Sequence, residues 1–247
     1  MALKGELKRV IFFIRKIKIF LIFRLLLPYT HKTFAVGRGQ PIDRVWIESY
    51  LSAQLSSHTI SKAPIFAAEF GDTKYIDSFL SDFETIPTVL APPSSFGYIF
   101  EQCTRNQIIL DLNRTLSAQG LLSFHGQDLI ICTQVLNFIA NPRQALESIA
   151  SLLNTNGIIV GSVSGTISPI SQYDDERGGH FWGFTVRSLA NLLQEHFEIL
   201  NIKSYGSPHT AAAFVLGYAA EELSTKLLYS ADNSFPVTIC FTARRKS

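Results

Sequence analysis

Short apolar runs of strand length recur along most of the chain, and stretches with helical spacing separate several of them. The runs are Pro64–Phe70, Pro87–Leu90, Gln107–Leu110, Asp128–Val135, Gly157–Val163, Phe197–Ile202 and Phe235–Ala243. The helical stretches are Thr73–Leu80, Pro142–Leu153, Thr185–His196 and Thr210–Leu223. Because strands that alternate with helices form mostly parallel sheets with helices on both faces, this pattern predicts a doubly wound α/β fold.

The two ends of the folded part add to this picture. Pro41 opens a helix through about Leu55, since proline suits the first helical turn and apolar residues follow at helical intervals. The last apolar run, Phe235–Ala243, follows the turn cluster Asp232–Ser234 rather than a crossover helix. We therefore expect an antiparallel final strand in a sheet of about seven strands, with a core that begins near Ile60.

The most apolar stretch is Val10–Leu27, whose length approaches the roughly 20 residues of a membrane-spanning helix. Four cations interrupt it: Arg15, Lys16, Lys18 and Arg24. Each cation near the centre of a spanning helix costs about 2.5 to 3.5 kcal/mol, which argues against a transmembrane helix. A signal peptide is also disfavoured, because no small-residue cleavage site follows the apolar stretch.

Charge is concentrated at the N-terminus. Residues 1–33 hold eight Lys or Arg and one Glu, a net charge of +7, so the rest of the chain carries −5. This favours a basic apolar helix at an anionic membrane surface, contacting it through residues 1–28. The alternative is a helix that docks on the body or on a partner. We expect an N-terminal helix over residues 1–35 and a folded domain over residues 36–247.

Composition narrows the function classes. Hydrophobic residues make up 47% of the 247 residues and charged residues 17%, which is typical of a globular protein. The mildly acidic body argues against a nucleic-acid partner, whose phosphates require a basic face. Three cysteines without a C-x-x-C pair, Cys103, Cys132 and Cys240, predict neither a disulfide framework nor a metal site. We expect a cytoplasmic protein, peripheral on the inner membrane face.

Polar residues follow several of the expected strands. Ligands of open α/β sheets bind beyond the carboxyl ends of the strands, so these positions are candidate binding residues. The first strand ends in Glu69, Gly71 and Asp72, where a glycine turn admits a close ligand and an acid orients its polar groups. The alternative is a turn glycine followed by a helix-capping Asp72. Asp111 follows the third strand and also suits a turn cap.

The order of these motifs resembles the methyltransferase type-11-like family, and in particular a bacterial branch associated with cell-surface glycan synthesis. The resemblance covers about Val36 to Lys246. It is carried by Arg38–Arg44 (RGQPIDR), Ala67–Tyr75 (AAEFGDTKY), Ile108–Leu112, Asp128–Leu136, Leu152–Ile159, Phe181–Thr185 (FWGFT) and Tyr205–Ser207. The family uses S-adenosyl-L-methionine on a class I methyltransferase fold, so the resemblance implies this cofactor and this fold.

Carried over by position, the resemblance implies the cofactor-binding residues. They are Glu69, Gly71, Asp72, Asp111, Leu112, Thr133 and Gln134, with Asp111 facing the adenine. For Thr133 and Gln134 the alternative is a polar strand end satisfied by local backbone. The chain departs from the family pattern at the end of the second strand, where Pro92–Ser95 lacks an acid, and at Gly183, which replaces an arginine. These departures weaken the expected cofactor affinity and remove an anionic contact.

The loop Ser171–Trp182 supplies candidates for proton transfer. Methyl transfer from a sulfonium requires alignment rather than a protein nucleophile, and a hydroxyl acceptor benefits from a base. His180 and Asp174 are the candidate catalytic residues, with Asp175 and Glu176 as further acids, and Gly178-Gly179 makes the loop a candidate lid. The alternative is a solvated acidic loop with a packed histidine.

The sequence thus predicts a methyltransferase that uses S-adenosyl-L-methionine. Its expected acceptor is a hydroxyl or similar group of a glycan or surface-polymer precursor, and a glycosyltransferase is an expected partner; both follow from the resemblance alone. The alternative is a catalytically impaired binding or scaffold protein with the same fold at the membrane. No H-E-x-x-H, P-loop or G-x-S-x-G motif supports a peptidase, a nucleotide hydrolase or an α/β-hydrolase.

Overall fold

The computed structural model describes residues 37–57, 64–93, 106–121, 125–170, 175–176 and 178–247, together with Ile14 and Ile17. These two isoleucines are helical and exposed. The rest of the expected N-terminal helix lies outside the described residues. Among the residues described, no helix is long and apolar enough to cross a bilayer.

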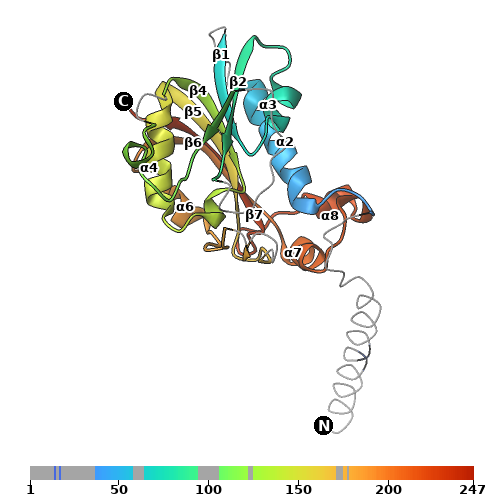
Figure 1. Ribbon diagram of the computed structural model, residues 1–247. Helices are drawn as coiled ribbons and strands as arrows, with labels where there is room; N and C mark the ends of the chain where they lie inside the picture. Colours follow the sequence, from blue (N-terminus) through green and yellow to red (C-terminus); the bar gives the residue numbers. More distant parts are fainter. Residues whose placement is uncertain are drawn as a thin grey trace.

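One seven-stranded sheet forms the centre of the domain (Figure 1). Its strands are β1 (Ile65–Phe70), β2 (Thr85–Ala91), β3 (Asn106–Ile109), β4 (Gln127–Thr133), β5 (Leu153–Ser164), β6 (Phe197–Tyr205) and β7 (Thr238–Arg245). Their order is β3-β2-β1-β4-β5-β7-β6. The first five pair in parallel, and β7 runs antiparallel to both β5 and β6. The predicted parallel sheet with an antiparallel final strand is confirmed.

Helices cover both faces of this sheet (Figure 1). One face carries α4 (Pro142–Leu152) and α6 (Val186–Leu193), and the other carries α2 (Ile42–Ser57), α3 (Lys74–Phe79), α7 (Pro208–Val215) and α8 (Thr225–Leu228). Single helical turns η3 (Ser117–Gln119), η4 (Leu136–Phe138) and η5 (Ala220–Glu222) complete the elements. Neighbouring strand residues point to opposite faces: Ala67 packs with α2, and Ala68 packs with α4.

Local sequence explains where the helices begin. The Asn141 side chain accepts a hydrogen bond from the Gln144 N–H, and Pro142 occupies the first turn of α4. Thr185 and Ser188 form a capping box at the start of α6. These caps place the N-terminal ends of α4 and α6 at the carboxyl edge of β4 and β5, where the candidate site lies.

The core begins earlier than expected from the sequence. Ile42, Trp46 and Ile47 of α2 are fully buried against the sheet, so the prediction of a core from about Ile60 was wrong. The Trp46 indole N–H donates to the Leu228 carbonyl at 2.9 Å, which joins α2 to α8. The helix at the N-terminal end of the domain is therefore part of its core.

The predicted helix Thr210–Leu223 was too long. Helix α7 ends at Val215, and Gly217 then adopts a left-handed backbone with a φ of 77°, a conformation that commonly follows the end of a helix.

 The segment after Gly217 turns toward the N-terminal end of the domain, where the Ala220 N–H donates to the Gln40 carbonyl at 2.9 Å. The Arg38 guanidinium also donates to the Gly217 carbonyl. The motif Arg38–Arg44 therefore anchors residues 217–222 rather than leaving them free to continue the helix.

Candidate active site

The strand order reverses between β1 and β4, because β2 and β3 lie beyond β1 whereas β5 follows β4. In open α/β sheets, ligands bind at such a switch point, beyond the carboxyl ends of the strands. The structure places Glu69 and Gly71 at this end of β1, Asp111 after β3, and Thr133 and Gln134 at the end of β4. The residues singled out in the sequence thus share one edge of the sheet.

Glu69 is buried and shapes the turn that follows β1. Its carboxylate accepts hydrogen bonds from the Tyr75 N–H at 3.0 and 3.2 Å and from the Ile76 N–H at 2.9 Å. Burial raises the pKa of Glu69 to about 8, although the two backbone N–H groups oppose this shift. Glu69 therefore holds the start of α3 in place; its predicted contact with the cofactor stays a prediction.

Gly71 and Asp72 form the turn itself. Gly71 has a φ of 95°, a left-handed conformation that favours glycine, and its N–H donates to the Leu90 carbonyl at 3.1 Å. The Asp72 carboxylate accepts a hydrogen bond from the Lys74 N–H at 3.0 Å, and the N-cap position of α3 is taken by Thr73. The turn consequently exposes backbone without a Cβ atom at Gly71, which suits the close approach of a nucleoside.

Asp111 lies in a turn with fixed backbone. One of its carboxylate oxygens accepts a hydrogen bond from the Asn113 N–H at 2.9 Å, and the Gln119 side chain holds its backbone. Leu112 is buried in the core against the α4 face of the sheet. Sequence reasoning missed Gln119, because nothing in its spacing from Asp111 marks the contact.

Gln134 also adopts a left-handed backbone, with a φ of 56°. Its N–H donates to the Ser162 carbonyl at 2.8 Å, and its side-chain oxygen accepts from the Ser164 hydroxyl at 2.9 Å. Thr133 is half-buried beside it. The amide oxygen of Gln134 is thus paired with a side chain of β5, and the predicted contact of Gln134 with the cofactor stays a prediction.

The loop after β5 brings His180 to the turn after β4. The His180 ring lies edge-on to Phe138 of η4, with ring centroids 5.2 Å apart, and the His180 backbone N–H donates to the Asp175 carboxylate at 3.1 Å. The His180 Nδ1 atom is buried and has no hydrogen-bond partner among the described residues. Asp174, the other candidate catalytic residue, lies outside the described residues.

Helix α2 adds charged groups close to the turn after β1 that sequence reasoning did not assign to the site. Glu48 accepts hydrogen bonds from the Lys74 ammonium at 2.8 Å and from the Gln40 amide at 2.7 Å. Burial raises the pKa of the Tyr75 hydroxyl, and the positive charge of Arg44 opposes this shift. The motif Arg38–Arg44 could have indicated these groups from the sequence, since it contains both Gln40 and Arg44.

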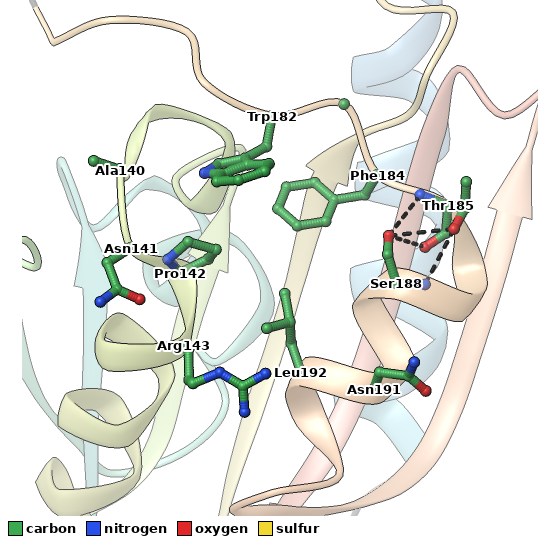
Figure 2. A pocket seen from close by; sticks show the side chains of 11 residues that line it. Ala140, Asn141, Pro142, Arg143, Trp182, Phe184, Thr185, Ser188, Asn191 and Leu192 are labelled. Atoms are coloured by element: carbon green, nitrogen blue, oxygen red, sulfur yellow. Dashed lines mark hydrogen bonds between the residues drawn. The ribbon is translucent and has the colours of Figure 1, made fainter.

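A cleft of about 640 Å³ lies between the N-terminal ends of α4 and α6 (Figure 2). Trp182, Phe184 and Leu192 supply apolar walls. Its polar lining consists of Asn141, Arg143, Thr185, Ser188 and Asn191. The Trp182 indole N–H donates to the Ile139 carbonyl at 2.8 Å, so the ring is fixed while 43% of the residue stays exposed. An exposed indole ring beside side-chain amides suits a ligand that has a flat face and several hydroxyl groups.

Gly183, which replaces the arginine of the family pattern, also lines this cleft. Arg143 of α4 supplies a cation there instead, and its guanidinium pairs with Glu195. Across the described part of the chain, no cluster of histidine, cysteine or acidic side chains is arranged to hold a metal ion. Cys132 and Cys240 are buried free thiols.

A family model described as a methyltransferase domain matches residues 75–199. No curated protein sequence matches the chain significantly. The family match spans the strands β2 to β5 and the cleft, so it includes most of the candidate site.

Solved structures share the fold. The CurJ carbon methyltransferase is 17% identical, with a TM-score of 0.53 over 81% of this chain, which spans about half (54%) of that protein. A chain from the complex of the Haloferax volcanii Trm112 methyltransferase activator with a candidate methyltransferase is 12% identical, with a TM-score of 0.51 over 83% of this chain and 92% of that one. At such identities the likeness establishes the fold.

Proposed function

The chain belongs to the methyltransferase domain family, and from this premise we propose that it transfers a methyl group from S-adenosyl-L-methionine to a hydroxyl or similar group of a glycan or surface-polymer precursor. One observation carries the proposal. Glu69 and Gly71 lie at the carboxyl end of β1 and Asp111 follows the carboxyl end of β3, on the edge that holds the switch point of the sheet and in the order of the family motifs.

These residues fit the cofactor chemically. The turn at Gly71 leaves room for a nucleoside against the backbone, because glycine has no Cβ atom and its φ is 95°. The Asp111 carboxylate accepts hydrogen bonds, as the exocyclic amine of an adenine requires. Glu69 fixes the turn through Tyr75 and Ile76. When bound, the cofactor would supply a sulfonium methyl group, whose carbon an acceptor atom attacks in line with displacement of the thioether sulfur.

The acceptor side rests on His180 and the cleft. The Nδ1 atom of His180 has no partner in the described residues, so it is free to take the proton that a hydroxyl acceptor loses on methylation. The exposed face of Trp182 and the amides of Asn141 and Asn191 support a sugar ring as the neighbouring group, since a ring face stacks on an indole and amides bind hydroxyl groups.

The proposal extends to location and partners. The basic apolar segment, residues 1–28, would hold the domain at an anionic membrane surface on the cytoplasmic side, where a lipid-linked precursor and a glycosyltransferase meet. Support comes from charge alone: residues 1–33 carry +7 and the remaining chain carries −5.

Transfer of a tritiated methyl group tests the proposed activity. The full chain is incubated with labelled S-adenosyl-L-methionine and a panel of methyl glycosides, and label in the sugar fraction is counted. We expect transfer to at least one sugar and a fall of about a hundredfold or more in His180→Ala, because general base catalysis contributes on that order. Cofactor binding without transfer to any sugar would favour the scaffold alternative.

A further inference from the structure

Asn137, in the turn η4, is completely buried, and neither its side-chain oxygen nor its side-chain nitrogen has a hydrogen-bond partner within the described structure. Buried polar groups in folded proteins are normally paired, because an unpaired one destabilises the folded state. A buried amide whose oxygen and nitrogen are both unpaired therefore lowers the free energy of unfolding. A ligand that forms hydrogen bonds with this amide would offset that loss.

The position of Asn137 links it to the candidate site. Its turn directly follows β4, and its backbone carbonyl accepts hydrogen bonds from the Phe181 N–H at 2.9 Å and the Trp182 N–H at 3.2 Å. The segment that carries His180 thus rests on the same turn, and the His180 ring contacts Phe138, the residue after Asn137. Two unpaired polar side chains, Asn137 and His180, therefore belong to two segments that contact each other after the carboxyl end of β4.

Not every buried unpaired side chain lies at this edge of the sheet. Gln127, for example, is 4% exposed with an unpaired amide oxygen, but it begins β4 at the opposite edge of the sheet. Because Gln127 is buried and unpaired but lies away from the candidate site, it provides a matched comparison for Asn137.

We infer that Asn137 binds the methyl acceptor, with its carboxamide engaging a pair of vicinal hydroxyl groups. A carboxamide presents one acceptor oxygen and two donor hydrogens in a plane. Its Nδ2 would donate to the hydroxyl oxygen that becomes methylated, and its Oδ1 would accept from the neighbouring hydroxyl. This inference rests on the proposed function and names the acceptor as a vicinal diol.

In the proposed reaction, His180 and Asn137 are the residues that contact the acceptor, and every bond, electron pair and proton is accounted for. The acceptor oxygen forms a bond to the methyl carbon while the bond from that carbon to sulfur breaks, and the sulfur keeps the electron pair. The hydroxyl proton passes to Nδ1 of His180. Asn137 keeps its protons throughout, so it orients the acceptor and does not act as a base.

Binding and stability measured together test this inference. Calorimetry compares the wild type, Asn137→Leu, Asn137→Ala and Gln127→Met as full chains, with and without S-adenosyl-L-homocysteine. The probes are methyl α-D-glucopyranoside and methyl α-D-mannopyranoside, which carry trans and cis diols, and their fully O-methylated forms. Urea unfolding is measured for each variant.

We expect at least one free glycoside to bind the wild type and Gln127→Met alike, and to bind both Asn137 variants about tenfold or more weakly. Asn137→Leu should need at least as much urea as the wild type to unfold, because it removes the unpaired groups. Fully methylated sugars should bind none of the chains.

The inference is overturned if neither glycoside binds the wild type, or if the Asn137 variants bind it as tightly as the wild type does. A chain that ignores S-adenosyl-L-homocysteine but loses glycoside binding in the Asn137 variants would overturn the proposed function and leave the assignment of Asn137 standing.

Discussion

The side chain of Gln119 brackets the backbone of Asp111. Its Oε1 accepts the Asp111 N–H at 2.8 Å, and its Nε2 donates to the Asp111 carbonyl at 2.9 Å. The same Nε2 also donates to the Arg114 carbonyl at 3.0 Å. One side chain therefore fixes the turn that presents the carboxylate proposed to bind adenine.

Replacing Gln119 should weaken cofactor binding, although Gln119 itself is not proposed to contact the cofactor. In Gln119→Leu the backbone of Asp111 loses two hydrogen bonds, and we expect the affinity for S-adenosyl-L-homocysteine to fall about three- to tenfold, as for one modest hydrogen bond. Gln194→Leu, on an exposed helix end, is the control and should bind normally. Equal affinities by calorimetry for both variants would show that Gln119 does not position the site.

Glu69 predicts a pH dependence of stability. Burial raises its pKa to about 8 in the folded protein, above the value of 4.5 expected in the unfolded chain. The folded state then binds the proton more tightly, so this group makes the free energy of unfolding fall as pH rises from about 4.5 to about 8. Above that range its contribution is constant.

Glu69→Gln removes this titration while keeping the size of the side chain. The variant should gain stability over the wild type as pH rises through this window, by up to about 1.4 kcal/mol per pH unit. Urea unfolding at several pH values from 5 to 9 measures the difference, in which other titrating groups cancel. Parallel curves for the two proteins would contradict the assignment.

The sheet was predictable because strand alternation is a local property, whereas several site contacts were not. Ala67 and Ala68 point to opposite faces, as period-two burial requires. The end of α7 depends on Gly217 and on its contact with Arg38, 179 residues away, which helical spacing cannot reveal. Asn137 lies in an apolar stretch that the sequence presents as core. That its side-chain amide is buried without a partner can be seen only in the structure.

Trp182 should report on the cleft. The chain has two tryptophans, of which Trp46 is fully buried and Trp182 is 43% exposed. We expect acrylamide to quench part of the tryptophan fluorescence, and this quenchable part should be absent in Trp182→Phe. A bound methyl glycoside should protect it from quenching. Quenching that persists unchanged in Trp182→Phe would show that the cleft is closed in solution.

The N-terminal segment should control membrane binding and leave folding intact. We expect the full chain to sediment with anionic vesicles and a chain lacking Met1–Pro28 to stay in solution, because each cation near such a surface contributes about 1 kcal/mol. High salt should weaken binding only in part, since the apolar contribution survives screening. Loss of the thermal unfolding transition on deletion would instead place this segment in the folded core.

Calorimetric titration of the full chain with S-adenosyl-L-methionine tests the central claim most directly. Gly71→Ala and Gly37→Ala form a matched pair, because both glycines have left-handed backbones, with φ of 95° and 78°, and a Cβ atom at Gly37 would contact nothing within 4 Å. We predict micromolar binding that is retained in Gly37→Ala and lost or greatly weakened in Gly71→Ala and Asp111→Ala. No heat at millimolar cofactor, or equal affinity in all four chains, would contradict a cofactor site at this edge of the sheet.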